Sequence, residues 1–295
     1  MTPRERGFLL LSSNLGNPDR KPLSTAQLRT LSQRVTRMSK PETDRDLELT
    51  DLLALGYDRT MAQRILALLS EEDLLEYYLR RGMRSGCVPI TRVSGGYPLV
   101  LRQRLGEESP GVLWAKGDVA LLTRPMIALV GSRDIRPENA QFAKEVGRQA
   151  ALQGYVLISG NARGSDRLAQ EACLAAGGQV ICVVADELEK QPAREQVLYL
   201  SEEGFDSAFT SPRALSRNRV IHALGEKTLV AQCAMAVGGT WSGTVQNLRH
   251  GWNPVFCFRD GTEASVQLEQ LGASLVDLQA LADLKALENE YLRLY

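Results

Sequence analysis

Three glycine-rich segments follow apolar runs between residues 126 and 244, and each has residues that could hold an anion. The first is Gly131-Ser132-Arg133, directly after the run MIALV. Glycine allows a tight turn, the serine hydroxyl and the following amides can face an anion, and arginine can bind it through two parallel hydrogen bonds. A purely structural turn is the alternative interpretation of these three residues.

The second segment, SGNARGSD, follows the run YVLI and contains Ser159, Gly160, Arg163 and Gly164. Two glycines flank the arginine, so we expect Arg163 to contact an anion. Asp166 stands where the next helix begins, and we expect it to cap that helix rather than to contact a ligand.

The third segment is GGTWSGT, which starts at Gly238 and ends at Thr244. Three glycines and three hydroxyls ahead of a helix are typical of a phosphate-binding turn, and Gly238, Gly239 and Thr240 are its candidate contacts. A flexible loop without a ligand is the alternative.

A fourth candidate is Arg217-Asn218-Arg219, at the start of an otherwise apolar helix. Internal ion pairs with Asp166 or Glu171 are the alternative role for its two arginines. Seven arginines and no lysine are expected near one edge of the fold. Arginine is favoured where a side chain makes bidentate hydrogen bonds to a phosphate. They are Arg133, Arg136, Arg163, Arg167, Arg213, Arg217 and Arg219.

The order of apolar runs predicts the framework that would position these residues. Strands are expected at 126–131, 155–160, 179–185, 228–234 and 254–258, with helices at 138–153, 165–176, 192–203, 213–224 and 243–250. Alternating strands and helices with nearly continuous apolar strands predict an α/β fold, a doubly wound, mostly parallel Rossmann-like sheet. Such sheets bind ligands beyond the carboxyl ends of their strands.

The N-terminal part has a helical pattern, with Leu28, Leu31, Val35 and Met38 at helical spacing. Two short helices around Gly56 resemble a helix-hairpin-helix, which could present amides to a phosphate or serve only for packing. We predict a small all-helical domain at 1–88, a Rossmann-like domain at 89–282 and a C-terminal helical tail at 283–295.

Bulk composition excludes several classes of protein. The 35 basic and 35 acidic residues cancel, so a generally basic nucleic-acid coat is excluded and any such site must be local. Five scattered cysteines, four of them in apolar runs, predict reduced thiols in a cytoplasmic protein. Two histidines make a histidine-rich metal site unexpected, and the N-terminal apolar run is too short for a signal peptide or a membrane span.

The motifs resemble those of the DprA/Smf (DNA-processing protein A) family. The stretch from VGSRDIRPENAQ to SGNARGSD and QVICVVA is similar to the family's VGSR, SGxAxGID and following strand. RNRVIHALGEKTLVAQCA resembles its RNR segment, and GGTWSGTVQNLRHGWNPVFCF its third glycine turn and strand. The resemblance covers about residues 95–280 in one order, and residues 1–88 are compatible with the family's sterile-alpha-motif-like or helix-hairpin-helix module.

The resemblance implies a homodimer that binds and protects single-stranded DNA and loads the RecA recombinase, in recombination and natural transformation, without catalysis or a cofactor. Residue by residue, it implies phosphate contacts by the residues that match the family's motifs. These are Gly131, Ser132, Arg133, Ser159, Gly160, Gly164, Arg217, Arg219 and Gly239.

The chain also departs from the family's pattern. GID reads Gly164-Ser165-Asp166, the third turn reads GGTWSGT where SGSLITA is more usual, and no winged helix precedes the end at Tyr295. These departures mark a diverged member and leave a role in transformation open.

Two other functions share this framework. A LOG-like phosphoribohydrolase needs a carboxylate where this chain has Asn247, and Asp186 is the best substitute, although we expect Asp186 in a solvated loop and His222 packed in the interior. A sensor of a nucleotide messenger in a defence system is the second. A dinucleotide-dependent oxidoreductase is disfavoured because the first turn lacks GxGxxG.

Overall fold

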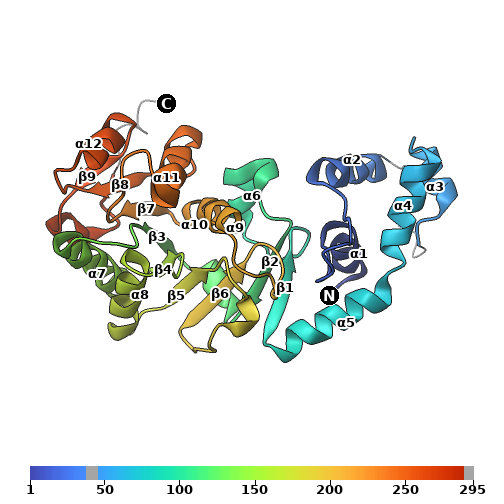
Figure 1. Ribbon diagram of the computed structural model, residues 1–295, viewed down its shortest axis with the longest axis horizontal. Coiled ribbons are helices and arrows are strands. Elements are labelled where there is room, and N and C mark those ends of the chain that lie inside the picture. The colour runs from blue at the N-terminus through green and yellow to red at the C-terminus, as the bar shows by residue number, and fades with distance from the viewer. Residues whose placement is uncertain (38–45, 289–295) are drawn as a thin grey trace. The chain divides into compact units, whose positions relative to one another are not determined.

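The computed structural model describes residues 1–37 and 46–288, which form two compact units. The first consists of residues 1–97 with 111–113, and the second of residues 98–110 with those from 114 onward. The first unit therefore extends past the predicted boundary at residue 88 by one strand. Figure 1 labels the elements of both units.

In residues 1–37 and 46–97, the first unit has five helices and a strand around an apolar core. The helices are α1 (Pro3–Ser12), α2 (Thr25–Thr36), α3 (Leu49–Ala54), α4 (Arg59–Leu69) and α5 (Glu72–Arg84), followed by β1 (Cys87–Thr91). Leu31, Leu52 and Ile65 are among its buried core residues. The predicted periodicity from Leu28 to Val35 lies in α2, whereas Met38 lies outside the described residues.

The predicted helical hairpin is present as α3 and α4. The amides of Leu55, Gly56 and Tyr57 donate to carbonyls of α3, with N–O distances of 2.9–3.1 Å. These three amides are therefore already bonded within the hairpin.

The second unit is organised around a mostly parallel sheet. Its strands run side by side in the order β2-β6-β5-β4-β3-β7-β8-β9, with only β2 antiparallel to its neighbour β6. The strands are β2 (Val112–Lys116), β3 (Met126–Val130), β4 (Val156–Ser159), β5 (Val180–Val183), β6 (Val197–Ser201), β7 (Lys227–Val230), β8 (Val255–Phe258) and β9 (Ser274–Val276). The predicted α/β Rossmann-like fold is confirmed. The direction of winding reverses between β3 and β7, where sheets of this kind bind ligands.

Helices cover both faces of this sheet. The α-helices are α6 (Leu99–Leu105), α7 (Pro137–Leu152), α8 (Ser165–Ala175), α9 (Ser211–Ser216), α10 (Asn218–Leu224), α11 (Gly238–His250) and α12 (Glu263–Gln270). Helices α7 and α8 pack together on one face and α10 and α11 on the other (Figure 1), as right-handed crossovers require on the two sides of the reversal. Short 3-10 helices complete the unit: η1 (Gly106–Glu108), η2 (Val119–Thr123), η3 (Leu188–Lys190) and η4 (Gln279–Asp283).

The helix predicted at 192–203 is wrong, because that segment contains strand β6. All five residues of VLYLS are buried, and a continuous apolar run of this length is what a strand inside a parallel sheet requires. At the C-terminus, η4 ends at Asp283 and no helix follows within 284–288. The rest of the predicted tail lies outside the described residues.

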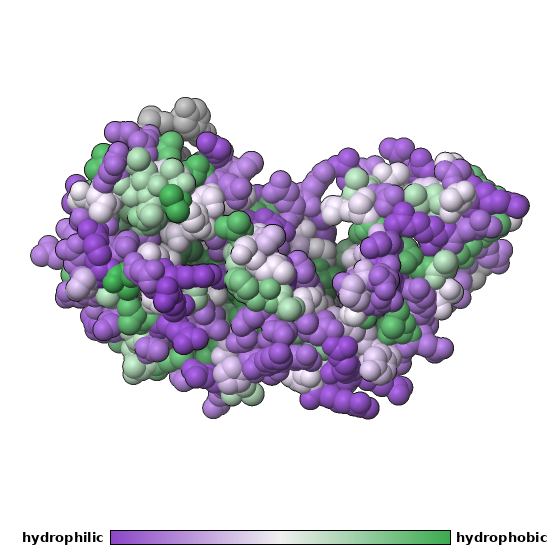
Figure 2. All heavy atoms as spheres, viewed as in Figure 1, coloured by the Kyte–Doolittle hydropathy of each residue, from purple (hydrophilic) through white to green (hydrophobic). Residues whose placement is uncertain are grey.

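The face shown in Figure 2 is mostly hydrophilic, with hydrophobic residues scattered among the polar ones. Within residues 1–37 and 46–288, no helix is both long and apolar enough to span a bilayer. In the same ranges, no three His, Cys, Asp or Glu side chains are grouped to hold a metal ion. All five cysteines are free and buried.

Candidate nucleic-acid interface

A cavity of about 510 Å³ opens at the carboxyl ends of β3 and β7, where the sheet reverses its winding. It is lined by the turn after β3, by the junction of α9 and α10, and by the N-terminus of α11. We call it the switch-point pocket. Of the predicted site residues, it brings together Gly131, Ser132, Arg133, Arg217, Asn218, Gly238, Gly239 and Thr240.

The turn after β3 presents one free cation to this pocket. Arg133 is exposed, and within the described parts of the chain its guanidinium has no hydrogen bond or ion pair. The Ser132 carbonyl accepts bonds from the Ser165 amide and hydroxyl at 3.1 and 3.0 Å, and the Gly131 carbonyl accepts one from Thr240 at 3.0 Å. The turn is thus held from both sides while Arg133 remains available.

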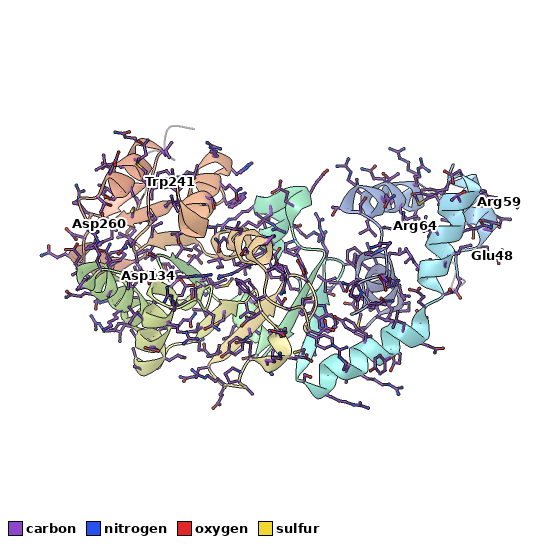
Figure 3. All side chains as sticks on the ribbon, in the orientation of Figure 1. Glu48, Arg59, Arg64, Asp134, Trp241 and Asp260 are labelled. Atoms are coloured by element: carbon purple, nitrogen blue, oxygen red, sulfur yellow. The ribbon has the colours of Figure 1, made fainter. Side chains whose placement is uncertain are left out.

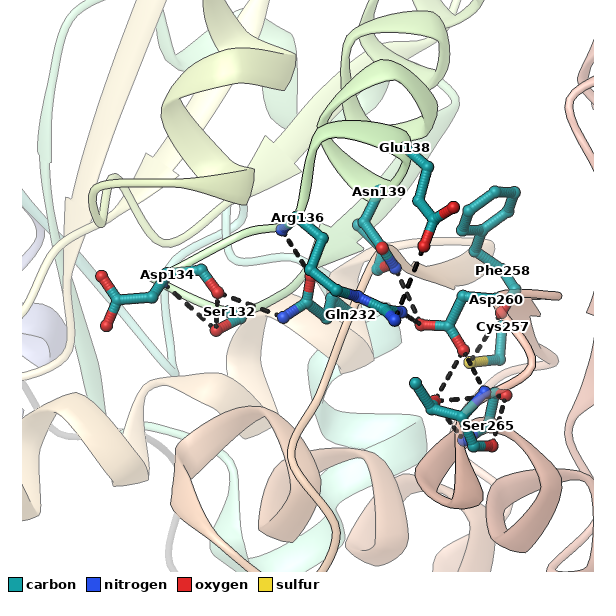
Figure 4. Close-up of polar contacts among 12 residues, drawn as sticks. Ser132, Asp134, Arg136, Glu138, Asn139, Gln232, Cys257, Phe258, Asp260 and Ser265 are labelled. Atoms are coloured by element: carbon teal, nitrogen blue, oxygen red, sulfur yellow. Dashed lines mark hydrogen bonds and ion pairs between the residues drawn. The ribbon is translucent and has the colours of Figure 1, made fainter.

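A polar network behind the turn fixes its far end (Figure 4). Asp260, after β8, accepts bonds from Arg136 at 2.6 Å and from Asn139 at 2.8 Å, and Gln232 accepts the Arg136 amide at 2.9 Å. Burial alone would raise the pKa of Asp260, but hydrogen bonds from Thr262 and Asn139 hold that pKa below its ordinary value. Arg136 is therefore committed to this carboxylate and does not face the pocket.

The uncapped N-terminus of α11 lines the pocket. Its N-cap residue is Val237, and no side chain caps the helix, so the first amides, Gly238 to Thr240, have no intrahelical acceptor. Asn218 donates to the Gly239 carbonyl at 3.0 Å, which ties α10 to this end of α11. Figure 3 labels Trp241 in the same first turn of the helix. Open amides and the positive end of the helix dipole together attract an anion.

Arg217 supplies a second, buried cation. It is only 8% exposed, yet it lines the pocket, and its Nε has no partner within the described residues. Its guanidinium lies directly against Gly160, where an added Cβ atom would collide with it. Glycine is therefore needed at position 160 for close packing with Arg217.

Two carboxylates balance the charge of Arg217 from a distance. Burial raises the pKa of Asp166, and the nearby Arg217 opposes that rise. Burial lowers the pKa of Arg217, while Asp166 and Asp186 oppose the change and Arg133 adds to it. A buried guanidinium with an unsatisfied Nε and a cationic neighbour is suited to receive an anion.

The second glycine-rich turn supports the pocket from behind. The Asp166 carboxylate accepts the amides of Gly160 and Ala162, both at 3.1 Å, and the N-cap of α8 is Gly164. The expected capping role for Asp166 is therefore wrong. Gly164 has φ +80°, and a Cβ atom there would strike the Ser132 and Arg133 carbonyls, so this turn packs against the first.

Five predicted site residues lie outside the pocket lining: Gly160 and Gly164, whose packing is described above, and Ser159, Arg163 and Arg219. Ser159 is fully buried and accepts a hydrogen bond from Gln170 at 2.5 Å. Arg163 forms an exposed ion pair with Asp134 at 3.0 Å. Arg219 pairs with Glu202 at 2.6 Å and donates to the Glu108 carbonyl at 3.1 Å.

The seven arginines predicted at the ligand edge do not all converge. Arg213 is buried and donates to the carbonyls of Ala185, Ser207 and Ala208 and to the Ser201 hydroxyl. Like Arg136 and Arg219, it holds the fold together. Arg133 and Arg217 are the two that line the switch-point pocket.

The sequence did not reveal an apolar rim around the pocket. Phe209, Leu215 and Val237 line it and are 51%, 51% and 67% exposed. Phe209 stands in the polar stretch DSAFTS just before α9, and an aromatic residue in such a loop was the available signal. Large exposed apolar side chains beside an anion site can contact sugars and bases.

The position that a LOG-like enzyme would give to a catalytic carboxylate lies in the interior. Asn247 is fully buried and donates to Asn253 at 2.6 Å and to His222 Nδ1 at 3.2 Å. His222 is also fully buried, as predicted, and burial lowers its pKa to about 3. Neither residue lines the pocket.

Comparison with known proteins places this fold in a family. Residues 89–280 match the family described as DNA recombination-mediator protein A. DNA processing protein DprA of Bacillus subtilis is 29% identical over 170 residues, 54% of this chain and 55% of that protein. DprA of Streptococcus pneumoniae is 33% identical over 141 residues, 44% of this chain and 50% of that protein. The chain thus matches about half the length of these curated relatives.

Two solved structures share the fold. DNA processing protein A of Streptococcus pneumoniae aligns with a TM-score of 0.66 and 23% identity, covering 86% of this chain and 95% of that one. DNA processing protein A of Helicobacter pylori, solved for its single-stranded DNA binding mode, aligns with a TM-score of 0.56 and 23% identity, covering 71% and 97%. Since the family match spans more than half of its residues, this chain belongs to the DNA recombination-mediator protein A family.

Proposed function

We propose that the switch-point pocket binds the phosphate backbone of single-stranded DNA. The observation that carries the proposal is Arg217, a buried guanidinium with an unpartnered Nε, beside the free Arg133 and the uncapped N-terminus of α11. These groups recognise phosphate oxygens and carry no base specificity. The single-stranded DNA binding mode of the Helicobacter pylori protein supports the same ligand class for this fold.

Within this proposal, the site residues predicted from the sequence have two roles. Gly131, Ser132, Arg133, Arg217, Asn218, Gly238, Gly239 and Thr240 line the pocket and contact the strand. Ser159, Gly160 and Gly164 shape it through packing, and Arg163 and Arg219 act through the loops that they tie down. The apolar rim at Phe209, Leu215 and Val237 favours a polymer with sugars and bases over an inorganic anion.

We further propose, from family membership, a homodimeric cytoplasmic protein that protects single-stranded DNA and helps to load RecA. The buried thiols suit a reducing compartment. We propose no catalysis, because Asn247 and His222 are buried away from the pocket and the Asp166 carboxylate is engaged by two amides. Loading is tested by the rate at which RecA displaces a single-strand-binding protein from DNA, with and without this protein.

A nucleotide-messenger sensor is the second candidate, because about 510 Å³ is within the usual range for a small-molecule pocket. Titration of fluorescent oligo-dT beside free mononucleotides separates the two functions. We expect binding that tightens with strand length and weakens steeply with salt, because phosphate contacts release counterions. Tighter binding of a mononucleotide than of a long strand would support the sensor instead.

Substitution Arg133→Ala tests the free cation of the pocket. We expect the binding free energy for oligo-dT to fall by about 1–3 kcal/mol, the range for charge-assisted hydrogen bonds. The slope of the logarithm of the binding constant against the logarithm of salt concentration should decrease in magnitude by about 0.7, because one phosphate contact is lost. The melting temperature should hardly change, because Arg133 has no partner to lose within the described residues. Arg249→Ala, at an exposed arginine outside the pocket, is the control. A similar loss in both variants would mean that only net charge matters.

A further inference from the structure

A second cavity lies on the face of the sheet that carries α8. The connection between β5 and β6 contains no α-helix, only the 3-10 helix η3 and a loop over residues 191–196. The gap between this loop and α8 is a cavity of about 220 Å³. We call it the α8 pocket. Its floor is formed by Cys182 and Tyr199, both nearly buried.

Two unpaired cations stand at the α8 pocket. Arg167 on α8 and Arg194 in the loop both line it and are exposed, and neither side chain bonds to any residue in 1–37 or 46–288. Glu171, one turn after Arg167, is the carboxylate in the lining, so one positive charge remains uncompensated. Arg194 lines the same cavity as Tyr199 and Cys182, and its charge opposes the rise that burial causes in the pKa values of both groups.

Residues of one turn contribute to both pockets. Ala162 and Asp166 line the switch-point pocket, while Asn161 lines the α8 pocket. Asn161 has φ +59° at the tip of this turn. The Cys182 thiol lies within electrostatic range of Asp166 and Arg217 on one side and of Arg194 on the other. A ligand that leaves the first pocket across this turn therefore meets Arg167 and Arg194 next.

We propose that the α8 pocket is a second subsite, which holds a further phosphodiester unit of the same DNA strand between Arg167 and Arg194. This inference rests on the proposed function of the switch-point pocket and adds a path for the strand across residues 160–164. The small volume suits one sugar–phosphate unit better than a whole drug-sized ligand, for which about 300–1,000 Å³ is usual.

The subsite is tested with the double substitution Arg167→Ala/Arg194→Ala and two ligands, a 5′-phosphorylated dT dinucleotide and a long oligo-dT. For the long strand we expect binding weaker by about 10- to 100-fold and a salt slope lower by about 1.4, because two phosphate contacts are lost. Calorimetric titration of the dinucleotide, which occupies only the switch-point pocket, should give an unchanged affinity. Glu171→Gln should tighten only the long strand, because it removes the opposing charge.

The control is Arg102→Ala/Arg249→Ala, which removes two exposed arginines that line neither pocket. An equal loss of affinity in the control variant, or an equal loss for both ligands, would mean that Arg167 and Arg194 act only through general electrostatics. Either result would overturn the subsite. Unchanged binding of the long strand in the Arg167/Arg194 variant would also overturn the subsite, but it would leave the proposed function of the switch-point pocket standing. If neither ligand binds the unaltered protein, the proposed function itself fails.

Discussion

Replacing Arg217 with methionine should weaken binding of single-stranded DNA by about 10- to 150-fold, the equivalent of the about 1.5–3 kcal/mol carried by a charge-assisted hydrogen bond. Methionine is flexible enough to fill the space over Gly160 and removes the charge. The same substitution should lower the free energy of unfolding, because Asp166 and Asp186 lose the cation that balances them. No direct ion pair joins them, so we expect less than the about 3–5 kcal/mol lost on breaking a buried salt bridge.

The double variant Arg217→Met/Asp166→Asn separates binding from stability. An asparagine oxygen can still accept the amides of Gly160 and Ala162, so removing the Asp166 charge should restore part of the stability. Binding should remain lost. Chemical denaturation and fluorescence anisotropy on the three proteins measure both quantities. Recovery of DNA binding together with stability would show that Arg217 serves only to balance Asp166.

The sequence predicted the framework of the second unit and the edge at which its ligand pocket lies. Every apolar run assigned to a strand, from MIALV to PVFCF, contains one, because buried parallel strands leave a strong local signal. Strand β6 was missed because a short apolar run such as VLYLS fits either a buried strand or a short buried helix segment, and periodicity alone does not separate the two.

The arginines show the limit of sequence reasoning more sharply. Residue type marked all seven as phosphate ligands, but their partners come from distant segments: Arg136 bonds to Asp260, and Arg219 to Glu202. Which arginine remains free depends on tertiary contacts that local spacing does not encode. Gly160 was predicted as a phosphate contact, and its close approach to Arg217 became visible only in the folded chain.

Helices α10 and α11 each carry one side of the switch-point pocket, and a buried polar cluster joins them behind it. The cluster contains His222, Thr228, Asn247 and Asn253, all at most 5% exposed. His222 Nδ1 lies 3.2 Å from Asn247 Nδ2 and 3.1 Å from Thr228 Oγ1, and Nε2 has no partner within the described residues. Burial disfavours the charged imidazolium and lowers the pKa of His222 to about 3.

His222 should therefore make the protein sensitive to acid. Below its ordinary pKa of 6.5, the unfolded chain binds a proton that the folded chain refuses, so stability is lost as pH falls. One such proton changes the free energy of unfolding by about 1.4 kcal/mol per pH unit, or roughly 2 kcal/mol between pH 6.5 and about pH 4.5. Urea denaturation across this window measures the slope.

The variant His222→Gln isolates this contribution, because glutamine does not titrate and its amide can bond to Asn247 or Thr228. Asp166 and Glu202, whose pKa values burial raises, titrate with the opposite effect, so the slopes of the two proteins are compared rather than read singly. We expect the variant to be less stable near neutral pH, since its fit is poorer, and to lose stability less steeply on acidification. Equal slopes in the two proteins would mean that His222 takes up its proton without unfolding, and that the cluster does not hold α10 and α11 together through a neutral imidazole.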